Sequence, residues 1–459
     1  AAVRVWDSST AYGHCWLILP IAAFLAWERR GQAAAARLAP RPALALLAVP
    51  LVVVWLAADL LGIMEGRQLA AIGFVEVALL AVFGPALWWA LAAALLYLVF
   101  LVPFGAFLTP ALQNFTTGFI LYGLGLFGIP HQAAGNHIEI PEGLFYVAEA
   151  CAGLRFLIAS IAFGVLYAVT MFTSPWRRVA FIAAACVVPV VANGFRALGI
   201  VLLGHWLGSP EAAATDHILY GWLFISLVIV ALAAAGMPFR EAPPRPPPPA
   251  PLPSPDLRMR AVYAVWPVLL LAAAGPALML GVNGRRPAPT ATAVLIAPAG
   301  CAETARYSVD GGLAQDFACV ATAVTTRFYV LPRGANPARV MTLAQAQPAA
   351  LLPNADLDAG KLEIPGANPQ AWVLARADRA AQAAAYLVYV NAGPVLGGLR
   401  DRLRLARGMI DGGDIAPAVL AVAVTHAAGD PLVPLRAFLA AQGDLTGRVA
   451  NALQRMPQK

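Results

Sequence analysis

The spacing of apolar residues along the chain predicts a protein that crosses a membrane several times. A spanning helix needs about 20 mostly apolar residues, and eight stretches approach or reach that length. They are residues 16–27, 43–62, 69–83, 86–103, 150–171, 179–204, 217–236 and 261–282. Residues 116–130 form a shorter, glycine-rich apolar piece, which we interpret as a re-entrant or interfacial segment, with a full span as the alternative.

Composition supports this interpretation and excludes one class of partner. The 459 residues are 60% hydrophobic and 12% charged, whereas about 25% of residues are charged in a typical soluble domain. The formal net charge is +7. No basic patch interleaved with aromatic residues accompanies that charge, so we expect no nucleic-acid partner.

Arginine placement orients the predicted spans. Three arginine-rich loops, residues 28–41, 175–178 and 239–260, each follow an odd-numbered span. All three therefore lie on one side of the membrane, and the positive-inside rule makes that side cytoplasmic.

The predicted fold is an α-helical polytopic membrane protein of about eight spans with a C-terminal extracytoplasmic α+β domain. We expect a membrane domain over residues 1–236, a cytoplasmic proline-rich linker over 237–260, a last span over 261–284 and the α+β domain over 285–459. Strand-like stretches in the last domain are residues 325–331, 385–390 and 418–424, and helical ones are 396–410 and 430–442. The proline run of the linker favours polyproline II, a semi-rigid spacer.

The five cysteines do not form a paired redox motif. No CxxC occurs, which argues against a zinc ribbon or a thioredoxin-like pair, and we expect no metal site and no cofactor. Cys301 and Cys319 could form a disulfide if the C-terminal domain lies in an oxidising compartment. Such a crosslink typically contributes ~3 kcal/mol.

Three predicted spans bring reactive side chains to the outer face. Cys151 opens the fifth span, Arg196 lies late in the sixth, and His217 opens the seventh. A thiol, a cation and an imidazole together could perform acyl transfer, with the thiolate attacking a carbonyl, the histidine moving the proton and the cation holding the oxyanion. Arg155, four residues after Cys151, would share its helical face, and Asn193 could orient a neighbour or donate to the oxyanion.

Each of these residues singly has an ordinary explanation. A cysteine in a membrane helix is most often a small packing residue, an arginine near a helix end can snorkel, and interfacial histidines such as His205 and His217 are common. An arginine inside a membrane costs ~2.5–3.5 kcal/mol on insertion scales and is functional by default. The convergence of the three at one face is what favours a site.

Three motifs at these positions resemble the exosortase/archaeosortase family of membrane cysteine transpeptidases. They read "EACAGLR" at 149–155, "NGFR" at 193–196 and "HILYG" at 217–221. Residues 6–21 and 135–155 also resemble family segments, the latter a short β-like approach to the cysteine motif. Ala152 stands where the family usually has serine.

The resemblance implies a function and a location. Cys151 would be the nucleophile, His217 the general acid/base and Arg196 the stabiliser of the oxyanion or thiolate. Substrates would be secreted proteins with a C-terminal sorting signal, made of a Pro-Glu-Pro motif, a transmembrane helix and a basic cluster. The enzyme, embedded in the lipid bilayer, would cut them at the outer face of the bacterial inner membrane and pass the acyl group to an unidentified acceptor.

The C-terminal region carries a looser resemblance. Residues 385–414 are similar to a periplasmic domain found beside, or fused to, exosortases in exopolysaccharide loci. This likeness implies an exosortase of the A type with its C-terminal domain in the periplasm.

Three other functions compete with this one. The first is a non-enzymatic membrane component of polysaccharide export or assembly, for which Cys151 would be dispensable. The second is a thiol–disulfide oxidoreductase, which would need Cys15 as the partner of Cys151. The third is another class of intramembrane protease, although serine (G-x-S-G) and zinc (H-E-x-x-H) motifs are absent from the sequence.

Overall fold

The computed structural model divides the chain into two compact units. One consists of Ala1–Val49 with Gln68–Ala272, and the other of Pro50–Arg67 with Ala273–Lys459. The residues that the structure describes are 3, 6, 12–208, 217–242, 255–284, 295, 297, 298, 300–309, 312–319, 323–332, 335–352, 358–364, 370–377, 381–390, 393–395, 399–410, 417–425, 429–442 and 445–454.

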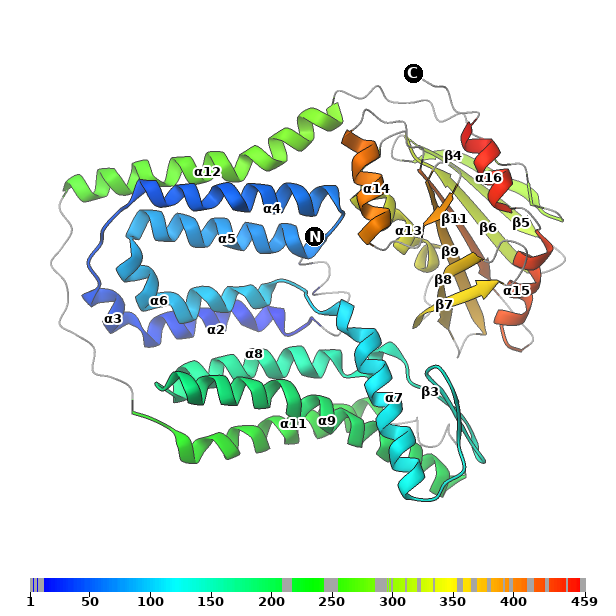
Figure 1. The fold of residues 1–459 in the computed structure, drawn as a ribbon, viewed down its shortest axis with the longest axis horizontal. Coiled ribbons are helices and arrows are strands. Elements are labelled where there is room, and N and C mark those ends of the chain that lie inside the picture. The colour runs from blue at the N-terminus through cyan, green and yellow to red at the C-terminus, as the bar shows by residue number, and fades with distance from the viewer. Residues whose placement is uncertain are drawn as a thin grey trace. The chain divides into compact units, whose positions relative to one another are not determined.

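Helices predominate among the described residues before residue 285 (Figure 1). The α-helices are α2 (Cys15–Glu28), α3 (Arg30–Ala35), α4 (Ala48–Leu60), α5 (Met64–Phe83), α6 (Pro85–Tyr97), α7 (Thr109–Leu126), α8 (Leu154–Met171), α9 (Pro175–Leu207), α11 (His217–Gly236) and α12 (Pro255–Gly284). Short 3-10 turns are η1 (Pro42–Leu47), η2 (Leu98–Leu101), η3 (Ala106–Leu108), η4 (Glu149–Ala152) and η5 (Met237–Phe239).

The helix positions agree with the predicted apolar runs, but fewer of them are long enough to span. Among the described residues, five helices are long and apolar enough to cross a membrane, and the bent pair α6 and α7 raises this number to six. α2 and the described part of α11 form shorter apolar helices, so the count of eight is not reached by length alone. α12 begins at Pro255, inside the segment that the sequence analysis assigned to the linker.

The segment predicted to be re-entrant or interfacial lies in α7. α7 follows α6 after a bend of 64°, and in Figure 1 it runs crosswise at one end of α8 and α9. Glycines allow it to pack closely on α9, because a Cβ atom at Gly194 would lie 2.8 Å from the ring of Phe119. A side chain on Gly123 would likewise strike Leu198.

A small antiparallel sheet leads from α7 to α8. It contains β1 (Gln132–Ala134), β2 (His137–Ile140) and β3 (Gly143–Tyr146) in that order. His137 stacks on its cross-strand partner Tyr146 with ring centroids 4.6 Å apart. This sheet is the predicted β-like approach to the cysteine motif.

The second unit contains a wholly antiparallel eight-stranded sheet, in the order β4-β5-β6-β11-β9-β8-β7 with β10 paired to β9. The strands are β4 (Ala302–Val309), β5 (Gly312–Cys319), β6 (Val324–Val330), β7 (Asp358–Ile364), β8 (Gln370–Ala377), β9 (Gln382–Val390), β10 (Gly393–Val395) and β11 (Pro417–Val424). The helices are α13 (Pro337–Leu351), α14 (Leu399–Ile410), α15 (Leu432–Ala441) and α16 (Leu445–Gln454).

Both faces of this sheet are covered by helices, which explains its buried central strand. Every residue of β11 is buried; Leu420 packs in a core with α15 and α16, whereas Val419 packs in one with α13 and α14. Strands buried on both faces read as continuous apolar runs, which is why β9 and β11 were predicted, whereas β6 was predicted from its β-branched and aromatic residues. A disulfide joins Cys301 to Cys319 at the end of β5.

Candidate active site

Cys151 lies in a tight turn before α8, not in the first turn of that helix. It belongs to η4, and α8 starts only at Leu154. Between them Gly153 adopts the left-handed conformation, with φ of 83°. The prediction that Cys151 and Arg155 share one helical face is therefore wrong, because the backbone changes direction at Gly153.

Gly153 is required at this turn for two reasons. Its positive φ is unfavourable for residues with a side chain. A Cβ atom there would also lie 2.7 Å from the Cγ atom of Asn193. The glycine thus lets the cysteine turn approach α9 at van der Waals distance.

Asn193 connects the cysteine turn to the arginine predicted in the site. Its Nδ2 group donates to the backbone carbonyl of Cys151 at 2.9 Å. Its Oδ1 atom accepts from Nε and Nη2 of Arg196 at 3.3 and 3.2 Å. Asn193 is only 2% exposed and Arg196 8%, so both polar groups depend on these partners, since buried unpaired polar groups are costly.

Arg155 joins the same cluster from α8. The guanidinium carbons of Arg155 and Arg196 lie 4.8 and 5.4 Å from the centroid of the Phe156 ring. Arg155 is also within electrostatic range of both Arg196 and Cys151. Within the described residues, its buried Nε atom has no hydrogen-bond partner. Arg155 is therefore a cation near the thiol, whereas Arg196 reaches the cysteine turn through Asn193.

The start of α11 reaches these arginines. A Cβ atom on Gly221 would lie 3.8 Å from Nη2 of Arg155 and 3.8 Å from Nη1 of Arg196. α11 begins one turn earlier, at His217, whose side chain lies outside the described residues. The glycine of the "HILYG" motif thus lies near both guanidinium groups, at a distance that would also accommodate a Cβ atom.

His205, the other histidine considered for catalysis, is engaged elsewhere. Its Nδ1 atom lies 2.8 Å from Oε2 of Glu142, in the turn between β2 and β3. The hydrogen bond with His205 lowers the pKa of Glu142 below its ordinary value. This pair fastens the end of α9 to the small sheet.

Sequence reasoning missed the contribution of α7. Gln113 donates to the carbonyl of Val147 at 3.0 Å, and the hydroxyl of Thr116 accepts from Asn193 at 3.4 Å. Thr117 donates to the side chain of Asn136 at 3.3 Å. The spacing of these polar residues in "QNFTT" places them on one helical face, a signal that was available in the apolar surroundings of the segment.

The predicted residues differ in how the structure groups them. It brings Cys151, Arg155, Asn193 and Arg196 together. The buried Cys15 packs in one apolar cluster with Ala152, and its thiol donates to the carbonyl of Phe100 at 3.3 Å. Cys15, Cys151 and Cys186 are free thiols. In the part of the chain that the structure describes, no three His, Cys, Asp or Glu side chains gather as metal ligands would.

Apolar spanning helices with a thiol and buried arginines at one end define a multi-pass membrane protein with a thiol-containing polar site. The family model of transmembrane exosortases matches residues 6–234, which include every residue of this site. The chain belongs to the exosortase family through this membrane part. The match ends before the C-terminal domain, and no curated protein and no solved structure matches the chain.

Proposed function

We propose that this protein is a membrane cysteine transpeptidase that cleaves sorting signals. Membership of the exosortase family supports membrane sorting activity in general. The observation that carries the assignment for this chain is the hydrogen-bond bridge of Asn193, which holds the turn of Cys151 beside the guanidinium of Arg196.

In the proposed reaction, the Cys151 thiolate attacks the carbonyl carbon of the scissile peptide bond. The new S–C bond gives a tetrahedral oxyanion, which Arg196 stabilises from its buried position. His217 removes the thiol proton and returns it to the leaving amine as the C–N bond breaks. An acceptor nucleophile then attacks the resulting thioester and releases Cys151.

Arg155 is assigned a different part. It lies near the thiol without a hydrogen bond to its Nε atom, so it would shape the site and counter negative charge that develops there during the reaction.

The proposed substrates are secreted proteins that carry a Pro-Glu-Pro motif, a transmembrane helix and a basic tail, in connection with exopolysaccharide production. A substrate anchored by a helix would present its scissile bond near the membrane surface. The arginine-rich loops support an outer position for the site. The disulfide of Cys301 and Cys319 supports a periplasmic C-terminal domain, since such bonds persist in oxidising compartments.

The test is processing of a tagged sorting-signal protein coexpressed with the full chain. Cys151→Ala, Arg196→Ala and His217→Ala are each expected to abolish or strongly reduce processing. Cys186→Ala is the matched control, because Cys186 is also a free, partly buried thiol but lies in α9 and not in the cysteine turn. Normal processing by Cys151→Ala would refute the proposal and favour a non-enzymatic membrane component of polysaccharide export.

A further inference from the structure

A cavity at the arginine-rich end of the membrane unit has no part in the proposed reaction. It has a volume of about 460 Å³ and lies between the end of α2 and the turn that joins α8 to α9. Its volume is within the roughly 300–1,000 Å³ range of small-molecule sites. Three arginines, Arg29, Arg30 and Arg178, contribute to its lining.

The hydrogen bonds of these arginines go to uncharged groups. Arg29 donates to the carbonyl of Val169 at 3.3 Å and to the side chain of Gln32 at 3.1 Å. Arg178 donates through Nε to the carbonyl of Phe172 at 2.8 Å. Arg29 and Arg178 also lie within electrostatic range of each other, so positive charge gathers in the lining of the cavity.

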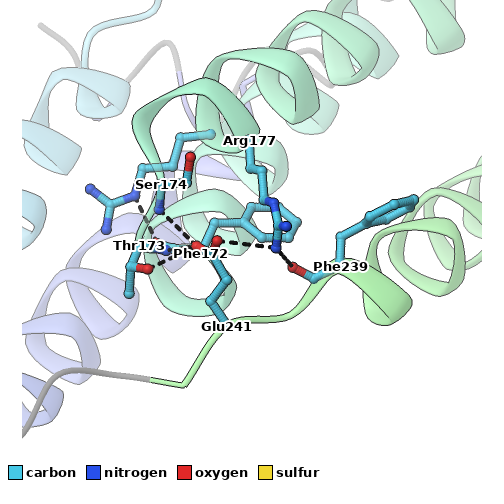
Figure 2. Close-up of polar contacts among 7 residues, drawn as sticks. Phe172, Thr173, Ser174, Arg177, Phe239 and Glu241 are labelled. Atoms are coloured by element: carbon cyan, nitrogen blue, oxygen red, sulfur yellow. Dashed lines mark hydrogen bonds and ion pairs between the residues drawn. The ribbon is translucent and has the colours of Figure 1, made fainter.

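One of the two carboxylates in the lining is already fully used. Glu241 accepts through Oε2 from the backbone N–H groups of Thr173 and Ser174 at 2.6 and 2.7 Å (Figure 2). Its Oε1 atom pairs with Arg177 at 3.0 Å. Arg177 lies outside the lining and pairs with Glu241, which also lies within electrostatic range of Arg178. The three lining arginines outnumber the two lining carboxylates, Glu28 and Glu241.

The surroundings of the cavity indicate the level of the lipid headgroups. Trp27 directly precedes lining residue Glu28, and Trp176 lies two residues before lining residue Arg178. They are 64% and 76% exposed, as expected for aromatic residues at a membrane interface. The Arg30 guanidinium lies 4.4 Å from the ring centroid of Trp27. Leu25, Val169 and Phe172 give the cavity an apolar wall. Such a wall suits the apolar part of a lipid, whereas a water-soluble anion has no apolar part to place against it.

From this combination we propose that the cavity binds the phosphate group of an anionic phospholipid. Arg29, Arg30 and Arg178 contact the phosphate, and the apolar wall receives the glycerol and the start of the acyl chains. Basic pockets between membrane helices bind anionic headgroups in this way. The bound lipid connects α2 to the α8–α9 turn. This proposal does not depend on the chemistry of Cys151.

The experiment uses the purified full chain in neutral detergent, with retained lipids counted by native mass spectrometry. Phosphatidylglycerol and phosphatidylcholine are supplied in equal amounts, and inorganic phosphate is added as a competitor. Wild type is expected to retain phosphatidylglycerol in preference, even with inorganic phosphate present. Arg29→Gln/Arg178→Gln is expected to lower retention by about thirtyfold, because two interfacial arginines together contribute roughly 2 kcal/mol to anionic-lipid attraction.

Two controls keep the test decisive. Arg37→Gln removes an exposed arginine outside the cavity and should retain lipid as wild type does. Arg29→Lys/Arg178→Lys preserves charge and should lose less lipid than the glutamine pair. Equal retention of the two lipids by wild type would overturn the proposal whether or not the double variant folds. Displacement of phosphatidylglycerol by inorganic phosphate would overturn the assignment of the cavity to a lipid.

Discussion

The two ends of the membrane unit both depend on arginine, but they hold it in different ways. At one end, Arg196 is buried and hydrogen-bonded to the side chain of Asn193. At the other, Arg29 and Arg178 donate to the carbonyls of Val169 and Phe172, at the C-terminal end of α8. Carbonyl groups at a helix end attract cations in any sequence context, whereas a buried side-chain pair requires specific partners.

Specific side-chain partners thus characterise the end that holds the thiol, whereas backbone carbonyl partners characterise the arginine-rich interfacial end. The free carbonyls of α8 can accept from many basic side chains, so substitutions there should be tolerated. The Asn193 bridge has one geometry, and it fixes three segments that are far apart in sequence: the cysteine turn, α7 and α9. We therefore expect substitutions at the site end to have the larger effects.

The largest effect is expected for Gly153→Ala. The new Cβ would strike Asn193 at a backbone conformation with φ of 83°, so the bridge to Cys151 should break and processing should be lost. Processing of a tagged substrate and the thermal unfolding midpoint measure the result. Gly128→Ala is the matched control, because φ is 68° there but nothing lies within 4 Å of the added Cβ. Equal effects at both glycines would mean that backbone strain alone, and not the contact with Asn193, is responsible.

Asn193→Ala should have the second-largest effect on processing. It leaves the Cys151 carbonyl and part of Arg196 without their partner, which costs about 1–3 kcal/mol for a buried group. Misplacement of the nucleophile should reduce the processing rate by about 100-fold. Asn114→Ala, at an exposed asparagine of α7, should leave processing unchanged. If Asn193→Ala processed substrate at the wild-type rate, the bridge would have no role in the site.

Arginine-to-lysine exchange compares the two ends directly. Arg196→Lys keeps the charge but loses the two-pronged contact with Asn193, so processing should fall about tenfold or more. Arg29→Lys retains a donor for the Val169 carbonyl and should change processing less than twofold, within the small effect typical of interfacial charges. A similar loss in both variants, measured on equal amounts of folded protein, would remove the distinction between the ends.

The smallest effect is expected on the unfolding midpoint when the pH is lowered and Glu241, at the arginine-rich end, becomes protonated. Hydrogen bonds from the backbone of Ser174 and from Thr173 lower the pKa of Glu241 from 4.5 to about 2. A lowered pKa in the folded state stabilises the fold above pH 4.5, and this contribution is lost as the pH falls toward 2. Glu241→Gln should therefore flatten the dependence of the unfolding midpoint on pH in that window.

Glu139→Gln is the control for the acid experiment, because Glu139 is exposed on β2. Its pH dependence should follow that of wild type. An unchanged slope in Glu241→Gln would show that the carboxylate does not stabilise the α8–α9 turn.

Apolar patterning located the helices because burial in a bilayer requires continuous apolar sequence. It did not reveal the break at Gly153, since "AEACAGLRFLIAS" is mostly apolar and a single glycine is tolerated within a helix. It also could not pair Asn193 with Cys151, because the two are 42 residues apart and only the packing of α9 on α8 brings them together.

In the C-terminal domain, too, apolar patterning predicted only some of the strands and helices. β9 and β11 were predicted because their burial on both faces makes them continuously apolar. β4, with the sequence AETARYSV, mixes polar and small residues at the sheet edge and gives no such signal. α13 and α16 were also not predicted, since their apolar faces become evident only against the sheet.

The central claim is that Cys151 forms a covalent bond to the substrate, and trapping that thioester tests it most directly. The full chain is incubated with a tagged sorting-signal substrate, quenched in acid and separated without reducing agent. We predict a hydroxylamine-sensitive adduct whose mass equals that of the enzyme plus the acyl part of the substrate, mapped to Cys151 and absent from Cys151→Ala. Complete substrate processing by Cys151→Ala, or an adduct mapped to Cys186, would contradict the account.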